Sequence, residues 1–312
     1  MTLEQDALKH FSEVSVALEL QTPDMTLNIG PQHPSTHGVL RIVAQVDGER
    51  VTDVKPVIGY MHRGYEKIAE VRTYPQITAL VNRIDWVSGF ANEIPFMAAT
   101  EKLMDIEVPE RARYIRMILT EMARISSHLM FMASYPLELG ATTPLMFALR
   151  ERERILDLIE SVTGGRFHPN FNRIGGVKPN AGAGPSQKKT VQDLPKGFLQ
   201  ATRDAMDELL STCDQFDELV TGNEIFLARC KGVGIMSAAL AADFGVSGPN
   251  LRASGVAFDL RTHTDYLPYD QVNFEVVTGT VGDSFDRWQV RLEEIRQAAH
   301  IVQQAVDQIP SG

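Results

Sequence analysis

Three stretches of the sequence carry apolar residues at alternating intervals of three and four positions, the spacing that lays a stripe along one face of an α-helix. The first stripe begins after Pro109 and stops before Pro136, and the third follows a capping residue at Asp283 or Ser284. Such stripes must be buried, so they predict helices packed against one another. The stripe residues are Ile115, Ile118, Met122, Ile125, Leu129 and Met132; Met206, Leu209, Cys213, Phe216 and Val220, with Gly222 as the stop; and Leu292, Ile295, Ala299, Val302, Val306 and Ile309.

Two further segments carry helical signals. One opens at Thr143-Pro144 and runs to Gly164, and another is expected over residues 75–104. Five long helices joined by short connections predict an antiparallel bundle. Within the bundle region, residues 232–282 are expected to return to β and turn structure.

The segment after Met25 shows β patterning instead. Strands are expected over residues 26–29, 38–46 and 50–57, with an Asp-Gly turn between the last two. The connection between the first two contains two prolines and the two histidines His33 and His37, so it is expected to be an irregular loop on a sheet edge.

These observations predict an α+β fold that is mainly α, with an N-terminal antiparallel sheet packed on a helical bundle. The expected organisation is a short amphipathic lead over 1–24, a β-sheet region over 25–74 and the bundle over 75–312. The bundle carries the β and turn insertion near 232–282, with strands near 256–260 and 272–277, and a Gly-rich surface loop over 175–189.

Charge and cysteine content exclude several functions. The formal net charge of −10 argues against a nucleic-acid partner. The only cysteines, Cys213 and Cys230, cannot build a four-cysteine metal or iron–sulfur site, and they suit a reducing compartment. No apolar run approaches the ~18 residues of a membrane-spanning helix. The chain is therefore expected to be soluble or to reach a membrane through partners.

Several polar groups could carry chemistry. His33 and His37 have the spacing of a helical metal pair, but Pro34 opposes a helix and no third ligand follows, so no metal site is expected and the pair either braces the loop or serves a function. Glu121, Arg124 and His128 share one side of a helix, where interhelical or solvated ion pairs are favoured over a catalytic cluster. The alternating charges of residues 150–154 are expected to form a solvated surface. Glu138, flanked by apolar residues after a helix end, is a candidate functional carboxylate.

Seven segments dispersed over the chain resemble one known family. They are MTLNIGPQHPSTHGVLR (25–41), IGYMHRGYEK (58–67), NRIDWVSGFANE (82–93), PLELGATTP (136–144), RFHPNFNRIGGVK (166–178), SGPNLRASG (247–255) and GDSFDR (282–287). Together they are similar to the D-type subunits of NADH:quinone oxidoreductase, respiratory complex I, which descend from the large subunit of nickel–iron hydrogenases. The resemblance implies the same hydrogenase-like fold.

The resemblance also implies a quinone site. In the family a loop histidine, here His37, donates to one quinone carbonyl and is held by an acidic residue, here Glu138, so these two are the expected catalytic pair. His33 and Ser134 are expected to line the site. The position of the family's second donor, a tyrosine, holds Trp86, whose indole N–H can donate a hydrogen bond but cannot deliver a proton at ordinary pH.

Further implied features concern electron supply. Arg63, Arg83 and His168 match residues that lie beside the terminal iron–sulfur cluster of a neighbouring subunit. NADH, FMN and the clusters are expected on partner subunits, with other peripheral-arm subunits and a membrane-arm subunit at the quinone entrance also in contact. The resemblance places the assembly on the cytoplasmic side of a bacterial cell membrane, coupled to proton translocation.

Three alternatives bear on the function. Hydrogenase activity is disfavoured because Asp85 and Ser88 replace the two cysteines of the hydrogenase motif. A non-catalytic, scaffold-like paralogue is suggested by Trp86 and by the expectation that family members continue well past Gly312. Input from ferredoxin rather than NADH remains open, because the input subunits are other chains.

Overall fold

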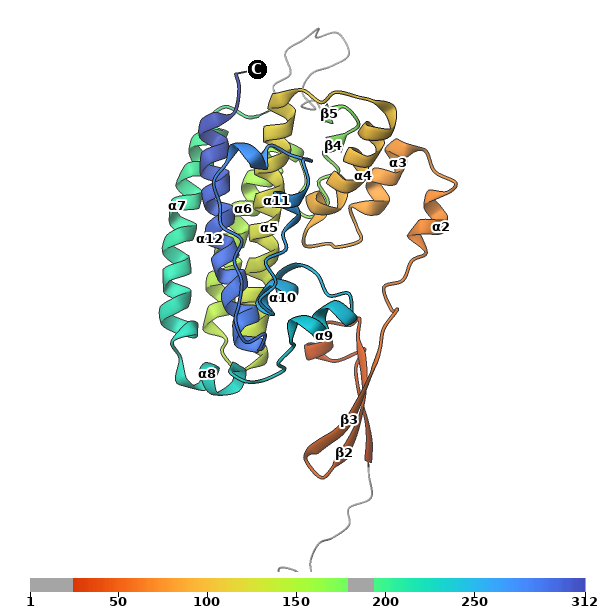
Figure 1. Cartoon of the computed structure of the whole chain (residues 1–312), viewed down its shortest axis with the longest axis vertical. Coiled ribbons are helices and arrows are strands. Elements are labelled where there is room, and N and C mark those ends of the chain that lie inside the picture. Colours follow the sequence, from red (N-terminus) through yellow and green to blue (C-terminus); the bar gives the residue numbers. More distant parts are fainter. Residues whose placement is uncertain (1–24, 179–193, 312) are drawn as a thin grey trace, which may run out of the picture. The chain divides into compact units, whose positions relative to one another are not determined.

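The computed structural model describes residues 25–178 and 194–311, and the chain divides into two compact units, residues 1–65 and 66–312. Figure 1 shows the helices and strands of both units. The predicted lead over 1–24 lies outside the described residues, as does most of the predicted loop over 175–189.

The first unit is a three-stranded antiparallel sheet in the order β1-β2-β3. In its register Met25 faces Val46 and Ile29 faces Ile42. Gly48, with φ +59°, forms part of the turn between the second and third strands, as the Asp-Gly signal predicts. The strands are β1 (Met25–Ile29), β2 (Arg41–Asp47) and β3 (Arg50–Val57).

The second unit is built on four long helices, α5, α6, α7 and α12. Each runs antiparallel to its neighbours around the bundle, as the order of colours in Figure 1 shows. The mainly helical α+β character and the small antiparallel sheet are therefore confirmed. The elements up to the second half of the chain are α2 (Tyr65–Ala69), α3 (Tyr74–Val81), α4 (Gly89–Met104), α5 (Glu110–Glu138), α6 (Thr143–Thr163), β4 (Asn172–Arg173) and β5 (Gly176–Val177). They are followed by α7 (Phe198–Phe216), the π-helix η2 (Asp217–Thr221), α8 (Glu224–Cys230), α9 (Ala238–Asp243), α10 (Gly248–Ala253), α11 (Leu260–His263), the 3-10 turn η3 (Tyr269–Gln271) and α12 (Ser284–Gln308).

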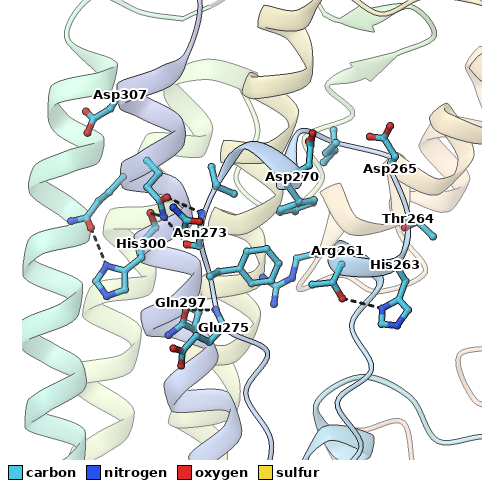
Figure 2. Close-up of a pocket in the computed structure, with 17 residues that line it drawn as sticks. Arg261, His263, Thr264, Asp265, Asp270, Asn273, Glu275, Gln297, His300 and Asp307 are labelled. Carbon is cyan, nitrogen blue, oxygen red and sulfur yellow. Dashed lines mark hydrogen bonds between the residues drawn. The ribbon is translucent and has the colours of Figure 1, made fainter.

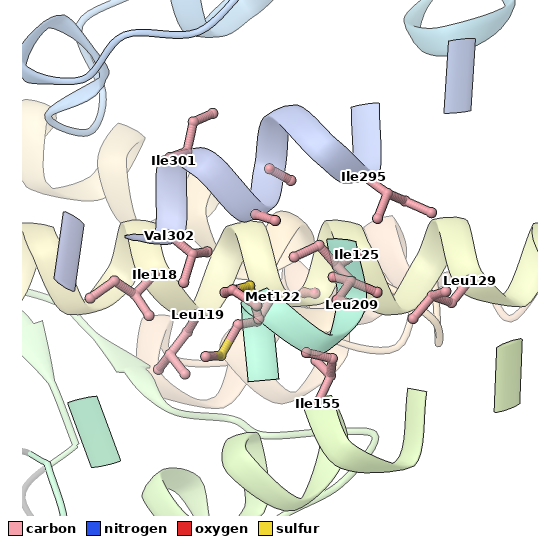
Figure 3. Packing of buried hydrophobic residues seen from close by; sticks show 14 of the residues in the cluster. Ile118, Leu119, Met122, Ile125, Leu129, Ile155, Leu209, Ile295, Ile301 and Val302 are labelled. Atoms are coloured by element: carbon pink, nitrogen blue, oxygen red, sulfur yellow. The ribbon is translucent and has the colours of Figure 1, made fainter. Parts of the chain in front are cut away.

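The predicted apolar stripes form the core of the bundle. Figure 3 shows Met122 of α5 among apolar side chains of the neighbouring helices, and its side chain is fully buried. Asp283 caps α12 as expected, accepting a hydrogen bond from Asp286 N at 2.9 Å. The residues labelled around Met122 are Ile118, Leu119, Ile125 and Leu129 of α5, Ile155 of α6, Leu209 of α7, and Ile295, Ile301 and Val302 of α12.

Two helix boundaries differ from the prediction. The helix expected over 75–104 is interrupted at residues 82–88, where Asp85 Oδ1 accepts a hydrogen bond from Val87 N and turns the chain. The helix expected to stop before Pro136 continues to Glu138.

The strands expected within 232–282 are wrong, because this fully described segment contains short helices and extended chain but no strand. Glutamine side chains of α12 supply the partners that a neighbouring strand would have offered. Asn273 N donates to Gln304 Oε1 at 2.8 Å, and Glu275 N donates to Gln297 Oε1 at 3.0 Å. The hairpin of β4 and β5 was not predicted, since its strands are too short to show a period.

Across residues 25–178 and 194–311, no helix combines the length and the apolar character needed to cross a membrane.

Candidate functional site

The histidine-bearing loop between β1 and β2 is tightly built. Thr36 Oγ1 donates to Pro31 O at 3.1 Å and to His33 O at 3.0 Å, and Thr36 is buried beneath the loop. Gly30, with φ +82°, is required, because a Cβ there would lie 2.2 Å from Leu40 O. A loop held by these internal hydrogen bonds presents its histidines on a fixed backbone.

Both loop histidines are exposed, in the first unit. His33 Nδ1 accepts a hydrogen bond from Ser35 N at 3.1 Å, so its neutral form carries the proton on Nε2, the nitrogen left to face a ligand. His37 caps the end of the short 3-10 turn Pro34–Thr36 in the left-handed conformation, with φ 51°. Arg63, also in this unit, is exposed.

In the second unit, one buried carboxylate joins the segments 82–93 and 166–178. Glu93 accepts hydrogen bonds from Asn82 Nδ2 at 2.5 Å, from Asn172 Nδ2 at 2.8 Å, and from the backbone N–H groups of Asn172 and Phe171 at 3.0 and 3.3 Å. Burial raises its pKa, and these hydrogen bonds oppose the shift. Sequence reasoning did not single out Glu93, whose partners lie far apart along the chain.

The two segments approach closely at Gly89. A Cβ at that position would lie 2.9 Å from Asn82 Nδ2 and 3.2 Å from Pro169 Cδ. The approach brings Trp86 against Phe167, with ring centroids 6.0 Å apart, while 47% of Trp86 stays exposed. Trp86 is therefore an accessible aromatic surface on a supported backbone.

A buried cation lies behind this aromatic pair. Arg152 is 4% exposed, its guanidinium lies 5.1 Å from the Phe167 ring centroid, and its Nε has no hydrogen-bond partner among the described residues. Burial lowers its pKa, and the charge of Arg166 acts in the same direction. The expectation that residues 150–154 form a solvated surface is thus wrong for Arg152 and for Glu151, which is also buried. The region after α6 covers Arg152, and alternating charges alone cannot reveal such cover.

The other predicted residues of this unit lie around the same pair or along α5. Arg83 donates from Nη1 to Ala79 O at 2.8 Å, and His168 directly follows Phe167. Ser134 is half-buried and Glu138, the last residue of α5, is exposed.

Trp86 and Ser126 of α5 line the same small void, so Trp86 lies beside α5 at the height of Ser126. At 1.5 Å per residue, Ser134 lies about 12 Å and Glu138 about 18 Å farther along the helix. The structure thus brings Trp86, Phe167 and Arg152 together and separates them from Glu138.

The cluster of Glu121, Arg124 and His128 proves to be part of a buried ion network. Glu121 accepts hydrogen bonds from Arg124 Nε at 3.0 Å, Arg261 Nη1 at 3.1 Å and the Tyr269 hydroxyl at 2.6 Å. Burial opposes the ionisation of Glu121, but the two arginines outweigh it and hold its pKa below the usual value. The favoured interhelical ion pairs are confirmed, and the solvated version is wrong because Glu121 is 0% exposed.

A second carboxylate continues the network. Glu294 Oε2 lies 2.7 Å from His128 Nε2, and Glu294 Oε1 accepts from Arg252 Nε at 2.6 Å. Burial opposes its ionisation, but His128 and Arg252 lower its pKa. Burial also lowers the pKa of His128, although the hydrogen bond and charge of Glu294 oppose this shift.

Cys213 and Cys230 are free and buried, on α7 and α8. Burial raises the pKa of Cys213 to about 12 and also raises that of Cys230. Among the described residues, no three His, Cys, Asp or Glu side chains are grouped as metal ligands.

A cavity of about 1110 Å³ lies between residues 261–275 and α12. Figure 2 shows acidic side chains, Asp265, Asp270, Glu275 and Asp307, and the imidazoles of His263 and His300 around it. None of the sequence-predicted site residues lines this cavity.

Comparison with known proteins gives consistent matches. The profile of the family described as "Respiratory-chain NADH dehydrogenase, 49 Kd subunit" matches residues 138–312. The chain is 50% identical over 286 residues to a D-type subunit of NADH-quinone oxidoreductase from Salinispora arenicola, covering 92% of this chain and 71% of the relative. It is 46% identical to the D-type subunit of NADH-quinone oxidoreductase from Clostridium beijerinckii, covering 94% and 76%, and 45% identical to the protein of the same name from Carboxydothermus hydrogenoformans, covering 94% and 77%.

Proposed function

Because this chain belongs to the family of the 49-kDa, or D-type, subunit of NADH-quinone oxidoreductase, respiratory complex I, we propose that it forms the chamber in which that enzyme reduces quinone. The observation that carries the proposal is Trp86, held half-exposed against Phe167 at the position of the family's second quinone donor. The tied loop that carries His33 and His37 supports it.

In the proposed site, His37 donates to one quinone carbonyl and Glu138 holds its imidazole, while Trp86 Nε1–H donates to the other carbonyl. Reduction of a quinone to a quinol takes two electrons and two protons. An imidazolium supported by a carboxylate is a suitable proton donor near pH 7, whereas indole supplies a hydrogen bond alone. His37 therefore delivers one proton, and water or a partner's group delivers the other. His33 and Ser134 line the chamber.

We assign the electron supply to a partner subunit. Cys213 and Cys230 lie buried on α7 and α8 and do not form a ligand set for an iron–sulfur cluster. A terminal cluster on the partner would supply the electrons. Arg63, Arg83 and His168 would face that cluster, and the buried charge of Arg152 behind Phe167 would add to a positive potential that favours electron arrival.

The same proposal fixes the setting of the chain. It would contact the cluster subunit, other peripheral-arm subunits and a membrane-arm subunit at the quinone entrance, while NADH and FMN bind elsewhere in the assembly. The complex would lie on the cytoplasmic side of a bacterial cell membrane and translocate protons. The hydrogenase-like ancestry of the fold belongs to this proposal as well.

The competing function is a scaffold-like subunit that docks its partners without reducing quinone, in this enzyme or in a ferredoxin-driven relative. The specific observation that favours it is Trp86 itself, which lacks the hydroxyl of a tyrosine.

The test uses the assembled complex purified from its host, with inhibitor-sensitive reduction of quinone by NADH as the readout. His37→Ala is expected to lower turnover at least tenfold, and the exposed His300→Ala on α12 serves as the matched control. Full activity of the His37→Ala complex would contradict the assigned chemistry. A fully assembled wild-type complex that leaves quinone unreduced, and that Trp86→Tyr does not rescue, would establish the scaffold.

A further inference from the structure

A second cavity in the helical unit, of about 490 Å³, carries none of the residues assigned to quinone. Residues of α4, α5 and α10 and of the segment 258–266 line it. We propose that this cavity binds an amphiphilic anion, a ligand with one acidic head group and an aliphatic tail. The proposal is independent of the quinone chemistry.

Part of the lining is apolar. It includes Ile94, Pro95 and Ala98 of α4 and Pro249 of α10. Phe258 and Leu260 also line the cavity and stay 40% and 56% exposed. Exposed apolar side chains beside a lined cavity give an aliphatic chain both a surface to bury and a way in.

Another part of the lining is cationic. It consists of Arg124, Arg252 and Arg261 together with a single carboxylate, Asp259. The guanidinium of Arg261 is already bonded, because it donates hydrogen bonds to the carboxylates of Asp259 and Glu121. Arg124 makes one hydrogen bond, from Nε to Glu121, so its Nη1 and Nη2 have no acceptor within the described part of the chain. A guanidinium edge of this kind matches a carboxylate or phosphate.

A buried hydroxyl also lines the cavity. Thr120 is 3% exposed, one turn before Arg124 on α5, and its Oγ1 has no hydrogen-bond partner among the described residues. An unpaired buried hydroxyl is costly, so a ligand oxygen that accepts from it gains free energy that water outside the cavity does not supply. Thr120 and Arg124 thus mark where the head group binds.

The charged groups of the ion network favour an anion over a cation or a neutral ligand. The network contains Glu121, Asp259 and Glu294 as acids and Arg124, Arg252 and Arg261 as bases. Arg291 adds a fourth guanidinium, bonded to Arg287 O and Asn250 Oδ1 rather than to a carboxylate. Among these groups, four guanidiniums stand against three carboxylates.

The experiment is isothermal titration of the full chain with decanoate below its micelle concentration, compared with decyl phosphate, decanol and decyltrimethylammonium. We expect saturable binding of at least one of the two anions, and binding at least tenfold weaker for the alcohol and the cation.

Three variants locate the site. Arg124→Gln is expected to weaken anion binding at least tenfold, and Thr120→Val about threefold to tenfold. Ala98→Phe is expected to fill the cavity and abolish anion binding. Arg203→Gln, which removes an exposed arginine paired with Asp307, is the control and should leave binding unchanged.

Thr120→Val keeps the shape of the residue and removes no hydrogen bond, so it tests the site even where Arg124→Gln impairs folding. Tighter binding of decyl phosphate than of decanoate would assign a phosphate head group and support the proposal. Absence of binding by both anions, or equal binding by wild type, Thr120→Val and Ala98→Phe, would overturn it.

Discussion

Replacing Glu294 by Gln should strongly destabilise the helical unit, whereas the same change at the adjacent Glu293 should not. Glu294 is 1% exposed and bonds His128 at 2.7 Å and Arg252 at 2.6 Å, whereas Glu293 is 40% exposed and pairs with Arg296 at 3.3 Å. Glutamine keeps the size of the side chain and one acceptor oxygen, so the substitution chiefly removes the charge.

The expected magnitudes follow from burial. Removing one charge of a buried ion pair lowers the free energy of unfolding by about 3–5 kcal/mol, because the other charge stays buried without its partner. After Glu294→Gln, Arg252 would keep only its hydrogen bond to Phe258 O and the carboxylate of Asp259 at 4.0 Å. An exposed pair such as Glu293–Arg296 contributes below about 1 kcal/mol. Urea unfolding at pH 7, followed by far-UV circular dichroism, measures both. A loss below about 1 kcal/mol for Glu294→Gln, or equal losses for the two variants, would refute the reasoning.

The pH dependence of stability gives an independent check on the direction of the pKa shift of Glu294. The pKa of Glu294 is lower in the folded chain than in the unfolded chain, so its contribution to stability is complete above the unfolded value of about 4.3 and is lost as the pH falls below it. The stability difference between wild type and Glu294→Gln should therefore shrink on acidification from pH 5. A difference that widens toward low pH would contradict the direction of the shift.

Three further predictions concern packing and thiol chemistry. Met122→Ala should lower the free energy of unfolding by about 2–5 kcal/mol, against almost no change for Met146→Ala, because Met122 is fully buried and Met146 is 67% exposed. Gly89→Ala should cost about 1–3 kcal/mol in the same urea assay, since its Cβ would lie 2.9 Å from Asn82 Nδ2; an unchanged midpoint would mean that the two segments part easily. Cys213, whose burial raises its pKa to about 12, should react with Ellman's reagent at pH 8 only after unfolding, and rapid labelling of the native chain would show that the thiol is accessible.

The local sequence pattern was sufficient to predict the elements whose signals lie within a few turns of chain. The apolar stripes of α5, α7 and α12 and the cap at Asp283 are read within a few turns of chain, and the structure confirms them. The break before α4 was missed although it is local, at Asp85, whose Oδ1 accepts a hydrogen bond from Val87 N between two segments that both carry helical signals. Arg152 was misjudged for a different reason, since its neighbours in the sequence alternate in charge while its cover comes from residues after α6.

The candidate site follows a similar division. The sequence itself marked His33, His37 and Glu138 as candidate functional groups, but their roles in a quinone site, and Trp86 altogether, came from resemblance to a family, because two histidines and a carboxylate have no period that would assign them a chemistry. The ion network was anticipated only as one face of α5. Its partners on α10, α11 and α12 could not be found without the fold, since a charged residue in a helix looks the same whether it faces water or Glu294.

The glutamine-bound segment before α12 has a consequence for hydrogen exchange. Asn273 N–H and Glu275 N–H are bonded to side chains of α12, whereas the intervening Phe274 N–H has no such acceptor among the described residues. Amide protons here should therefore exchange with deuterium in an alternating slow and fast rhythm, although the chain is neither helix nor strand. Gln297→Ala should release Glu275 and leave Asn273 slow. These amides thus report, residue by residue, on the side-chain conformations of a neighbouring helix.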